Sequence, residues 1–300
     1  MKKVVVTGGA GFIGSHLVDE LLKLEYEVHV IDDLSTGKIE NVDNRATLYN
    51  IDISKAPQTR LDSIVKGAEY VFHLAAKTAV QESLTNPELY EQINCLGLLK
   101  ILNSAQSANV KRFIFSSSSS IYGDSNRIPT SEDLSTPDPF SPYALTKLVG
   151  EEYCKLFSKV FNLDTVSLRY FNVYGDRMNN EGGYKLLFPI FKELKQKGLS
   201  LTINNDGEQR RDFIHVKDVV RANIIAASKN EKIRGNVFNI GTGKNYSVNE
   251  IASMFGGERT YVEGVIEPKE TLADTSKSDL ELDFRSKYSL EDWLTKWIIT

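Results

Sequence analysis

The most constraining feature of the chain is a glycine-rich turn that directly follows a short apolar run. The three valines at residues 4–6 lead into a turn in which Gly8, Gly11 and Gly14 stand three residues apart. An apolar segment with helical periodicity follows, so the order is buried strand, tight turn and helix. Such a turn presents backbone N–H groups at the positive end of a helix, where they can bind a pyrophosphate. The segment therefore predicts a dinucleotide site near the start of the chain.

A second apolar run, at residues 28–31, ends in Asp32 and Asp33. An acidic side chain at this position can accept hydrogen bonds from the ribose hydroxyls of adenosine, and it repels a 2′-phosphate. These residues therefore predict NAD, and not NADP, as the cofactor.

Strand-like and helix-like segments alternate through the first half of the chain. The expected strands are residues 3–7, 28–31, 47–51, 70–74, 112–116 and 165–169. The expected helices are residues 15–24, 87–108 and 143–161. This alternation predicts an α/β fold with a Rossmann-like, doubly wound parallel sheet. We expect residues 1–170 and about 214–241 to form the NAD-binding domain. Residues of about 171–213 and 242–300 would form a smaller C-terminal substrate-binding lobe that closes over the sheet.

Composition narrows the possible partners. The formal net charge is −4 and basic arrays are absent, which argues against nucleic acid as a partner. No apolar run approaches the length of a membrane span, so we expect no membrane contact. The cysteines Cys95 and Cys154 and the four histidines lack metal-ligand spacing. We therefore expect a cytoplasmic protein with reduced cysteines and no metal site.

Hydroxyl and amine groups are placed for acid–base chemistry. Ser118 lies in a serine run at the end of the predicted strand 112–116, where side chains reach the ligand crevice. Tyr143 and Lys147 are four residues apart in a helix that Pro142 can begin, so they share one face. At about 4 Å and an effective dielectric near 20, an ammonium and a phenolate attract by roughly 4 kcal/mol. This attraction lowers a tyrosine pKa by about three units, so Tyr143 can serve as a general base near neutral pH.

With these residues identified, the chain resembles the extended short-chain dehydrogenases/reductases. Within them it is most similar to the NAD-dependent nucleotide-sugar epimerases, and nearest to the UDP-glucose (UDP-galactose) 4-epimerases. The matching segments are residues 7–14, 32–37, 52–53, 73–76, 115–123, 143–147, 169–175, 211–216 and 272–274. The resemblance implies 4-epimerisation of a UDP-hexose, or of the N-acetylhexosamine pair, through a transient 4-keto intermediate.

The resemblance also implies roles for individual residues. Tyr143 would act as acid and base on the sugar 4-hydroxyl, Lys147 would lower its pKa and hold the nicotinamide ribose, and Ser118 would bind the 4-oxygen. The expected NAD site comprises Gly8, Gly11, Phe12, Ile13, Asp32, Asp33, Ser35, Thr36, Gly37, Asp52, Ile53, Leu74, Ala75, Ala76, Ser116, Tyr143, Lys147 and Tyr170. The expected UDP-sugar site comprises Ser118, Asn172, Leu187, Arg211 and Thr271, with Asn172 and Arg211 on the diphosphate.

The chain departs from the family pattern at several positions. Gly264 stands where an arginine usually binds phosphate, and residues 204–205 are both asparagine where an aromatic residue and glycine are usual. Thr271 occupies a position that often limits the size of the sugar, and its small side chain leaves room for an N-acetylhexosamine.

Other functions remain open at this stage. Ser119 and Ser120 stand where 4,6-dehydratases carry acidic residues, and a glutamate usual in UDP-glucuronate decarboxylases is absent at Ser120. A UDP-glucuronate 4-epimerase or decarboxylase of the same family is the alternative, with Arg177 as a conceivable partner for the sugar carboxylate. A non-catalytic NAD-binding sensor or scaffold is a third possibility, although such proteins usually lack the tyrosine–lysine pair.

The expected helices at residues 87–108 and 143–161 carry more apolar side chains than one face of a sheet requires. Relatives form homodimers through two such helices, so we expect a homodimer.

Overall fold

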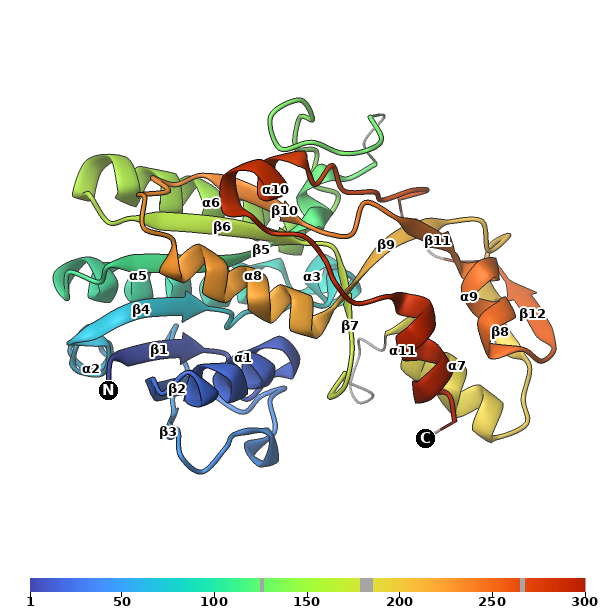
Figure 1. The fold of residues 1–300 in the computed structure, drawn as a ribbon, viewed down its shortest axis with the longest axis horizontal. Coiled ribbons are helices and arrows are strands. Elements are labelled where there is room, and N and C mark those ends of the chain that lie inside the picture. The colour runs from blue at the N-terminus through green and yellow to red at the C-terminus, as the bar shows by residue number, and fades with distance from the viewer. Residues whose placement is uncertain (125–126, 179–185, 265–267, 300) are drawn as a thin grey trace.

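A parallel sheet forms the larger part of the molecule in the computed structural model, which describes residues 1–124, 127–178, 186–264 and 268–299. The strand order is β10-β6-β5-β4-β1-β2-β3, and every pairing within this sheet is parallel (Figure 1). The strands are β1 (Lys3–Thr7), β2 (Glu27–Asp32), β3 (Thr47–Asn50), β4 (Ala68–His73), β5 (Arg112–Ser118), β6 (Thr165–Tyr170) and β10 (Val237–Ile240). The strand order reverses between β1 and β4, which is where open α/β sheets bind ligands. The predicted Rossmann-like fold is confirmed.

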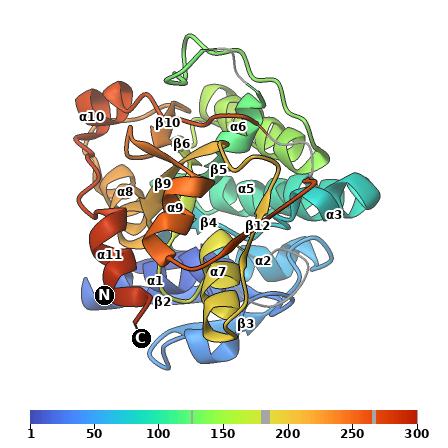
Figure 2. The ribbon, with the colours of Figure 1, turned by 90° about the vertical axis from the view of Figure 1, so that its right-hand side faces the viewer.

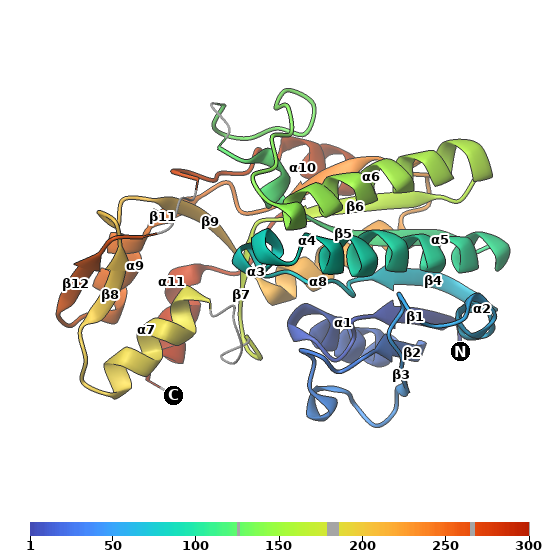
Figure 3. The ribbon, with the colours of Figure 1, turned by 180° about the vertical axis from the view of Figure 1, so that it is seen from behind.

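Helices cover both faces of this sheet. Figure 1 shows α1 (Phe12–Lys23) and α8 (Val216–Ser228) on one face, with α10 (Ser276–Leu282) beside β10. The view from behind shows α5 (Gly97–Ser107) and α6 (Pro142–Phe161) on the other face (Figure 3). The remaining helices of this part are α2 (Gln58–Val65), α3 (Val80–Thr85), α4 (Pro87–Tyr90) and the short turns η1 (Ile39–Asn41), η2 (Glu91–Leu96) and η3 (Ser119–Tyr122). Apolar side chains fill the space between each helical layer and the sheet.

A smaller lobe lies beyond the carboxyl ends of the strands (Figures 1 and 2). It contains a three-stranded sheet of β11 (Asn245–Ser247), β9 (Arg210–His215) and β7 (Asn172–Tyr174), and a two-stranded sheet of β12 (Arg259–Val262) and β8 (Leu201–Asn204). Its helices are α7 (Leu187–Gln196), α9 (Val248–Phe255) and α11 (Leu290–Trp297). An aromatic core holds the lobe together: the ring of Phe188 lies 5.0 Å from that of Phe213 and 6.0 Å from that of Trp293.

Some element boundaries differ from the predictions for clear physical reasons. The strand expected at 112–116 continues to Ser118, because Ser117 and Ser118 pair with Arg169 and Tyr170 on β6. The helix expected at 15–24 begins at Phe12, inside the glycine-rich segment. The helix expected at 87–108 is divided into α4, the π-helical turn η2 and α5. In contrast, α6 begins as predicted, with Pro142 in its first turn and the Ser141 hydroxyl capping the Ala144 N–H.

Candidate active site

The glycine-rich turn is packed so tightly that side chains cannot replace its hydrogens. Gly8 has a φ of +72°, and a Cβ there would lie 2.7 Å from the Ala75 backbone nitrogen. A Cβ at Gly14 would lie 2.1 Å from the Gly8 carbonyl oxygen. Gly11 donates its N–H to the same oxygen at 3.2 Å. The turn therefore lies directly against the segment after β4, where Leu74, Ala75 and Ala76 were predicted to contact the cofactor.

Asp32 connects the end of β2 to this turn. Its side chain is buried, and its two oxygens accept hydrogen bonds from the backbone N–H groups of Ala10 and Leu34, both at 2.9 Å. Burial raises the pKa of Asp32, whereas these two hydrogen bonds oppose the rise. Each carboxylate oxygen has a second lone pair, which is the group that a ribose hydroxyl requires.

Most of the other residues predicted for the cofactor lie in the segments that follow β2, β3 and β4. Asp33 accepts the Ser35 N–H at 2.9 Å, and a Cβ on Gly37 would lie 2.8 Å from the Ala10 carbonyl carbon. Asp52 accepts the N–H and hydroxyl of Ser54 at 2.9 and 2.7 Å. The Ala75 N–H donates to the Thr7 hydroxyl at 3.1 Å, which ties the end of β4 to β1. Phe12 and Ile13 are the first two residues of α1, and Ile53 is buried.

These observations test whether the residues fit NAD. Gly8 and Gly11 are partly exposed, and neither carries a side chain that would stand between the backbone of the turn and a pyrophosphate. Asp32 lies at the end of β2, beside the turn, with acceptor positions for adenosine ribose hydroxyls. The residues fit the dinucleotide.

Tyr143 and Lys147 lie one turn apart at the start of α6. Lys147 is buried, and its Nζ atom donates to the Ser116 carbonyl oxygen at 2.8 Å. The Nζ atom also lies 6.0 Å from the centre of the Tyr143 ring. Burial lowers the pKa of Lys147 to about 8, and the negative charges that oppose this shift include Glu151. Lys147 is therefore a cation at neutral pH that titrates just above it.

Ser118 caps the short turn η3 at the end of β5. Its hydroxyl oxygen accepts the Ser120 N–H at 3.2 Å, and the residue is only half-buried. Tyr170 follows on the neighbouring strand, where it is buried and its hydroxyl exchanges hydrogen bonds with the Asn223 amide at 2.8 and 3.0 Å. The structure thus places Ser116, Ser118, Tyr143 and Lys147 around the end of β5.

The predicted substrate residues come from several elements of the lobe. Arg211 on β9 donates to the carbonyl oxygen of Arg210 at 2.8 Å, and the Thr271 N–H donates to that same oxygen at 3.0 Å. Asn172 begins β7, directly after β6, and Leu187 begins α7. The structure therefore brings Arg211 and Thr271 side by side.

A buried carboxylate that the sequence did not single out fixes this part of the lobe. Asp212 accepts hydrogen bonds from the Thr242 hydroxyl at 2.6 Å, the Gly243 N–H at 3.0 Å and the Ala273 N–H at 3.2 Å. The turn after β10 and the segment that carries Thr271 are thereby joined to β9. The only signal for this role in the sequence was a glycine–threonine–glycine turn at 241–243.

The two departures at Gly264 and residues 204–205 are physically linked. The Gly264 N–H donates to the Asn205 side-chain oxygen at 3.0 Å. A Cβ at Gly264 would lie 2.7 Å from the Asn204 Cβ and 2.8 Å from the Asn205 amide nitrogen. The two asparagines therefore fill the space next to the Gly264 Cα, where the Cβ of an arginine at this position would lie.

His73 and the two cysteines are buried within the large sheet domain. His73 stacks against Phe113 and Phe115 and contacts the Thr7 hydroxyl at 3.0 Å, and burial lowers its pKa to about 3. Cys95 and Cys154 are unpaired and buried. Within residues 1–124, 127–178, 186–264 and 268–299, no cluster of histidine, cysteine and acidic residues could hold a metal ion. Over the same ranges, no helix is both long enough and apolar enough to cross a membrane.

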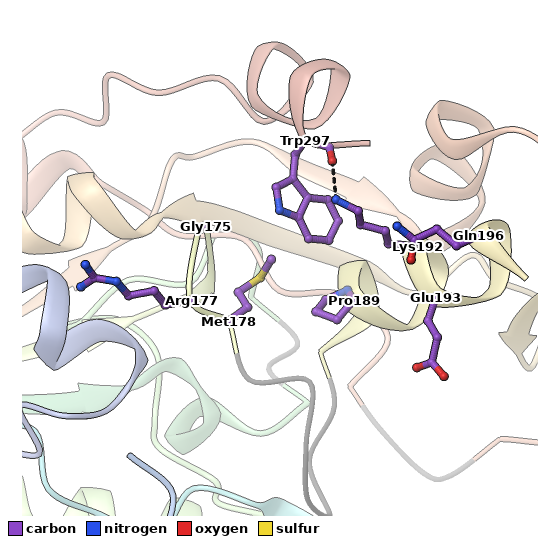
Figure 4. A pocket seen from close by; sticks show the side chains of 8 residues that line it. All are labelled: Gly175, Arg177, Met178, Pro189, Lys192, Glu193, Gln196 and Trp297. Atoms are coloured by element: carbon purple, nitrogen blue, oxygen red, sulfur yellow. Dashed lines mark hydrogen bonds between the residues drawn. The ribbon is translucent and has the colours of Figure 1, made fainter. Parts of the chain in front are cut away.

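A pocket of about 570 Å³ lies in the smaller lobe, between the segment after β7 and helices α7 and α11 (Figure 4). The Nζ atom of Lys192 donates to the Trp297 carbonyl oxygen at 2.8 Å and lies 4.3 Å from the centre of that indole ring. Arg177, the conceivable carboxylate partner of the glucuronate alternative, lines this pocket, whereas the residues predicted for NAD and for the UDP-sugar do not. The predicted acid–base groups lie instead around the carboxyl end of β5.

Comparison with known proteins agrees with this geometry. The sequence model of the "NAD dependent epimerase/dehydratase family" matches residues 4–241. A UDP-glucose 4-epimerase from Thermotoga maritima, solved with UDP-glucose, is 36% identical with a TM-score of 0.93, and the match covers 99% of this chain and 97% of that one.

Two further solved structures are similar over nearly their whole length. One is a UDP-N-acetylglucosamine 4-epimerase from Methanobrevibacter ruminantium in complex with UDP-N-acetylmuramic acid (37% identity, TM-score 0.92, 99% and 97% coverage). The other is a UDP-glucuronic acid 4-epimerase from Bacillus cereus in complex with UDP-glucuronic acid and NAD (34% identity, TM-score 0.89, 99% coverage of both chains).

Proposed function

Because the chain belongs to the NAD dependent epimerase/dehydratase family, we propose that it is an NAD-dependent UDP-sugar 4-epimerase that acts through a transient 4-keto intermediate. The observation that carries this proposal is the arrangement of Tyr143, Lys147 and Ser118 at the carboxyl ends of β5 and β6. The carboxyl ends of these strands point toward the smaller lobe (Figure 1).

In the proposed reaction, Tyr143 removes the proton of the sugar 4-hydroxyl. The Lys147 ammonium, fixed on the Ser116 carbonyl, favours the phenolate form of Tyr143 by charge attraction. The Ser118 hydroxyl donates to the 4-oxygen as this atom becomes a carbonyl oxygen. NAD, when bound, supplies the acceptor for the hydride from C4 and its later return. Tyr143 then gives its proton back to the 4-oxygen, so the protein ends the cycle unchanged.

Inversion at C4 requires the opposite face of the sugar to be presented to the same cofactor. The UDP group must therefore be held while the hexose turns. We propose that Arg211 and Asn172 bind the diphosphate, since an arginine fork matches phosphate oxygens. Asp212, next to Arg211, supports this grip by fixing β9 to the segment that carries Thr271.

The sugar is the finer part of the proposal. Thr271 is small and lies beside Arg211, which leaves space for a 2-acetamido group, so we propose activity on the N-acetylhexosamine pair as well as on glucose and galactose. The similarity to a UDP-N-acetylglucosamine 4-epimerase supports this range. Arg177 was the residue considered as a partner for the carboxylate of a glucuronate. It forms a 2.8 Å ion pair with Asp19 on α1, so it gives less support to the glucuronate alternative.

We also propose that residues 1–170 with about 214–241 bind NAD, and that about 171–213 with 242–300 bind the UDP-sugar.

A homodimer through α5 and α6 would cover Leu145, Leu156 and Val160, which are 51%, 46% and 59% exposed. Part of the apolar surface expected for this contact, including Leu98, Ile101 and Leu102, is instead buried within the chain.

The two cysteines form no disulfide, which supports a cytoplasmic location.

Proton NMR of the purified protein tests the proposal directly. UDP-galactose, UDP-N-acetylgalactosamine and UDP-glucuronate are incubated separately, first without and then with added NAD. A new anomeric signal from the 4-epimer identifies the sugar. No conversion of any of the three, even with NAD, would contradict the proposed function. A protein that binds NAD but converts none of the three sugars, and whose Tyr143→Phe variant binds NAD equally well, would favour the non-catalytic sensor.

A further inference from the structure

A fully buried polar network lies directly beneath the predicted catalytic residues. Its centre is Glu151 on α6, which is 0% exposed, and its main partner is Arg169 on β6, which is 3% exposed. Arg169 donates through Nε and Nη2 to the two oxygens of Glu151, at 2.9 and 2.7 Å. This two-point contact fixes the plane of the carboxylate as well as its position.

The same carboxylate holds the end of β5. The Ser117 hydroxyl donates to Glu151 Oε1 at 2.5 Å. Ser117 and Arg169 are partners in the register of β5 and β6, so both side chains leave the sheet on the face that α6 covers. Glu151 therefore binds two neighbouring strands to one helix.

The third nitrogen of the Arg169 guanidinium also has a partner. Its Nη1 atom donates to the Tyr122 hydroxyl at 2.6 Å, and this hydroxyl donates to the Asn239 side-chain oxygen at 2.7 Å. Arg169 thus has a defined partner for each side of its guanidinium group. A buried network in which each nitrogen of the guanidinium has a partner can hold the surrounding backbone rigidly.

This network meets the catalytic groups at two points. Ser117 lies between Ser116, whose carbonyl holds Lys147, and Ser118, the predicted partner of the 4-oxygen. Glu151 also follows Lys147 by one helical turn, so both side chains lie on the same face of α6. Tyr143, Lys147 and Glu151 form a row at four-residue intervals along that face.

We propose that Glu151 is a positioning residue of the epimerase site: held by Arg169, it locks Ser117 to α6 and so keeps Ser118 and Lys147 aligned with Tyr143. This inference rests on the proposed function, and it adds a residue that touches neither substrate nor cofactor. Glu151 also provides a fixed negative charge that favours the ammonium form of Lys147.

The test compares three variants of the full-length, NAD-loaded protein. Glu151→Gln removes the charge, Ser117→Ala removes only the connection to β5, and Glu152→Gln is the matched control. Glu152 is the next residue on α6, but it is exposed and paired with Lys155 at 2.7 Å. Thermal unfolding and steady-state kinetics over a pH series are measured for each.

For Glu151→Gln we expect kcat to fall about 10- to 100-fold with KM for the UDP-sugar changed little, because misplaced groups slow the reaction more than binding. The alkaline limb of the kcat profile should move to lower pH, since Lys147 loses a charge that favours its ammonium form. Ser117→Ala should lower kcat about tenfold without moving that limb. Glu152→Gln should match the wild type.

A second readout does not depend on turnover. The pKa of Lys147 can be followed by NMR of carbon-13-labelled lysine, with its signal assigned from a Lys147→Arg variant. Glu151→Gln should lower this pKa, and Glu152→Gln should leave it in place. If the wild type converts no UDP-sugar, the proposed function fails, while this titration still decides whether Glu151 acts on Lys147.

The inference is overturned if folded Glu151→Gln keeps both the wild-type kcat and the wild-type alkaline limb. It is also overturned if activity is lost only in proportion to the fraction unfolded, because that is a purely structural effect. If Glu151→Gln does not fold, Ser117→Ala decides the question, and a wild-type kcat in that variant overturns the inference.

Discussion

The Nζ atom of Lys147 lies 2.8 Å from the carbonyl oxygen of Ser116, which joins the start of α6 to the end of β5. The hydrogen bond orients the ammonium group toward the strand end from which Ser118 projects. Since Tyr143 lies one turn earlier on α6, this contact helps to hold the helix face that carries Tyr143 and Lys147 against the strand that carries Ser118.

Replacement of Tyr143 by phenylalanine should abolish the proton transfer without disturbing the fold. We expect kcat to fall by about 10²- to 10⁴-fold, the usual contribution of a general base. NAD and UDP-sugar affinities, measured by calorimetry, should change little. Tyr261→Phe is the matched control, because Tyr261 is 51% exposed and its hydroxyl contacts only Asn249 among the hydrogen bonds of the described residues. Wild-type turnover in Tyr143→Phe would exclude Tyr143 as the base.

The pKa of Lys147 predicts the alkaline side of the pH profile. Because burial lowers this pKa to about 8, the ammonium is lost above that pH and kcat should decline there. In Lys147→Arg the cation persists, so a reduced activity should remain level to higher pH. Initial rates from pH 6 to 10 would check this. Equal alkaline limbs in both proteins would mean that another group titrates.

The same shift predicts how stability depends on pH. The unfolded lysine titrates near its ordinary value of 10.5, so between about pH 8 and 10.5 the unfolded chain binds more protons than the folded one. Stability of the wild type should therefore rise with pH in this window relative to Lys147→Met, and the difference should be constant below it. Urea unfolding at several pH values measures this difference, and a falling difference would contradict the assignment.

Gly14→Ala should damage the dinucleotide turn. The added Cβ would lie 2.1 Å from the Gly8 carbonyl oxygen, which is backbone and cannot turn away. We expect a loss of about 1–3 kcal/mol in the free energy of unfolding and a clear loss of NAD affinity. In Gly198→Ala the new methyl meets open space, so only the left-handed backbone costs about 1 kcal/mol. NAD binding that survives in Gly14→Ala would argue against this turn as the pyrophosphate site.

Asp32→Asn tests the acidic end of β2. Both carboxylate oxygens of Asp32 accept backbone N–H groups. In Asp32→Asn one of these N–H groups would meet the amide NH₂, which is also a donor, and the lost hydrogen bond should lower the free energy of unfolding by about 1–3 kcal/mol. We expect NAD affinity to fall about tenfold, which corresponds to 1.4 kcal/mol. Asp279→Asn, which alters an exposed pair with Arg285, should leave NAD binding intact. Calorimetry with NAD separates the two outcomes.

Leu145→Lys tests the proposed dimer. Leu145 is half exposed on α6, and a charge there would have to be buried against the partner helix. We expect the molar mass from light scattering to halve relative to the wild type. Leu280→Lys on α10 is the control, because Leu280 is 84% exposed and lies outside the proposed contact. A wild-type mass in Leu145→Lys would place the contact elsewhere or show a monomer.

The sequence identified what depends on local pattern. The glycine turn, Asp32 and the pair Tyr143 and Lys147 could be predicted as site residues because their chemistry requires fixed spacing along one strand, turn or helix. Fold class followed from the same periodicity. Glu151 lay four residues beyond Lys147, at a spacing that places it on the same helical face. Its proposed role depends on Ser117 and Arg169, which become neighbours only when β5 and β6 pair.

Asp212 was missed for a related reason. Its hydrogen-bond partners Thr242, Gly243 and Ala273 come from two separate segments, and the residues around Asp212 do not predict which segments will contact it. Gly264 shows the reverse case. The sequence marked it as a missing arginine, whereas the structure explains it by the nearby Asn205 side chain.

The path of the chain between the two lobes determines how cooperatively the protein unfolds. The chain passes from β6 into β7, returns through β9 into α8, leaves again from β10 into β11 and comes back at α10 (Figure 1). Asp212 and the hydrogen bonds between Thr130 and residues 272–274 fasten these crossings to one another. Neither lobe can therefore be cut out as a continuous fragment, and heat should melt both in one cooperative transition. A nucleotide bound to the large sheet would then protect even the distant C-terminal helix from hydrogen exchange.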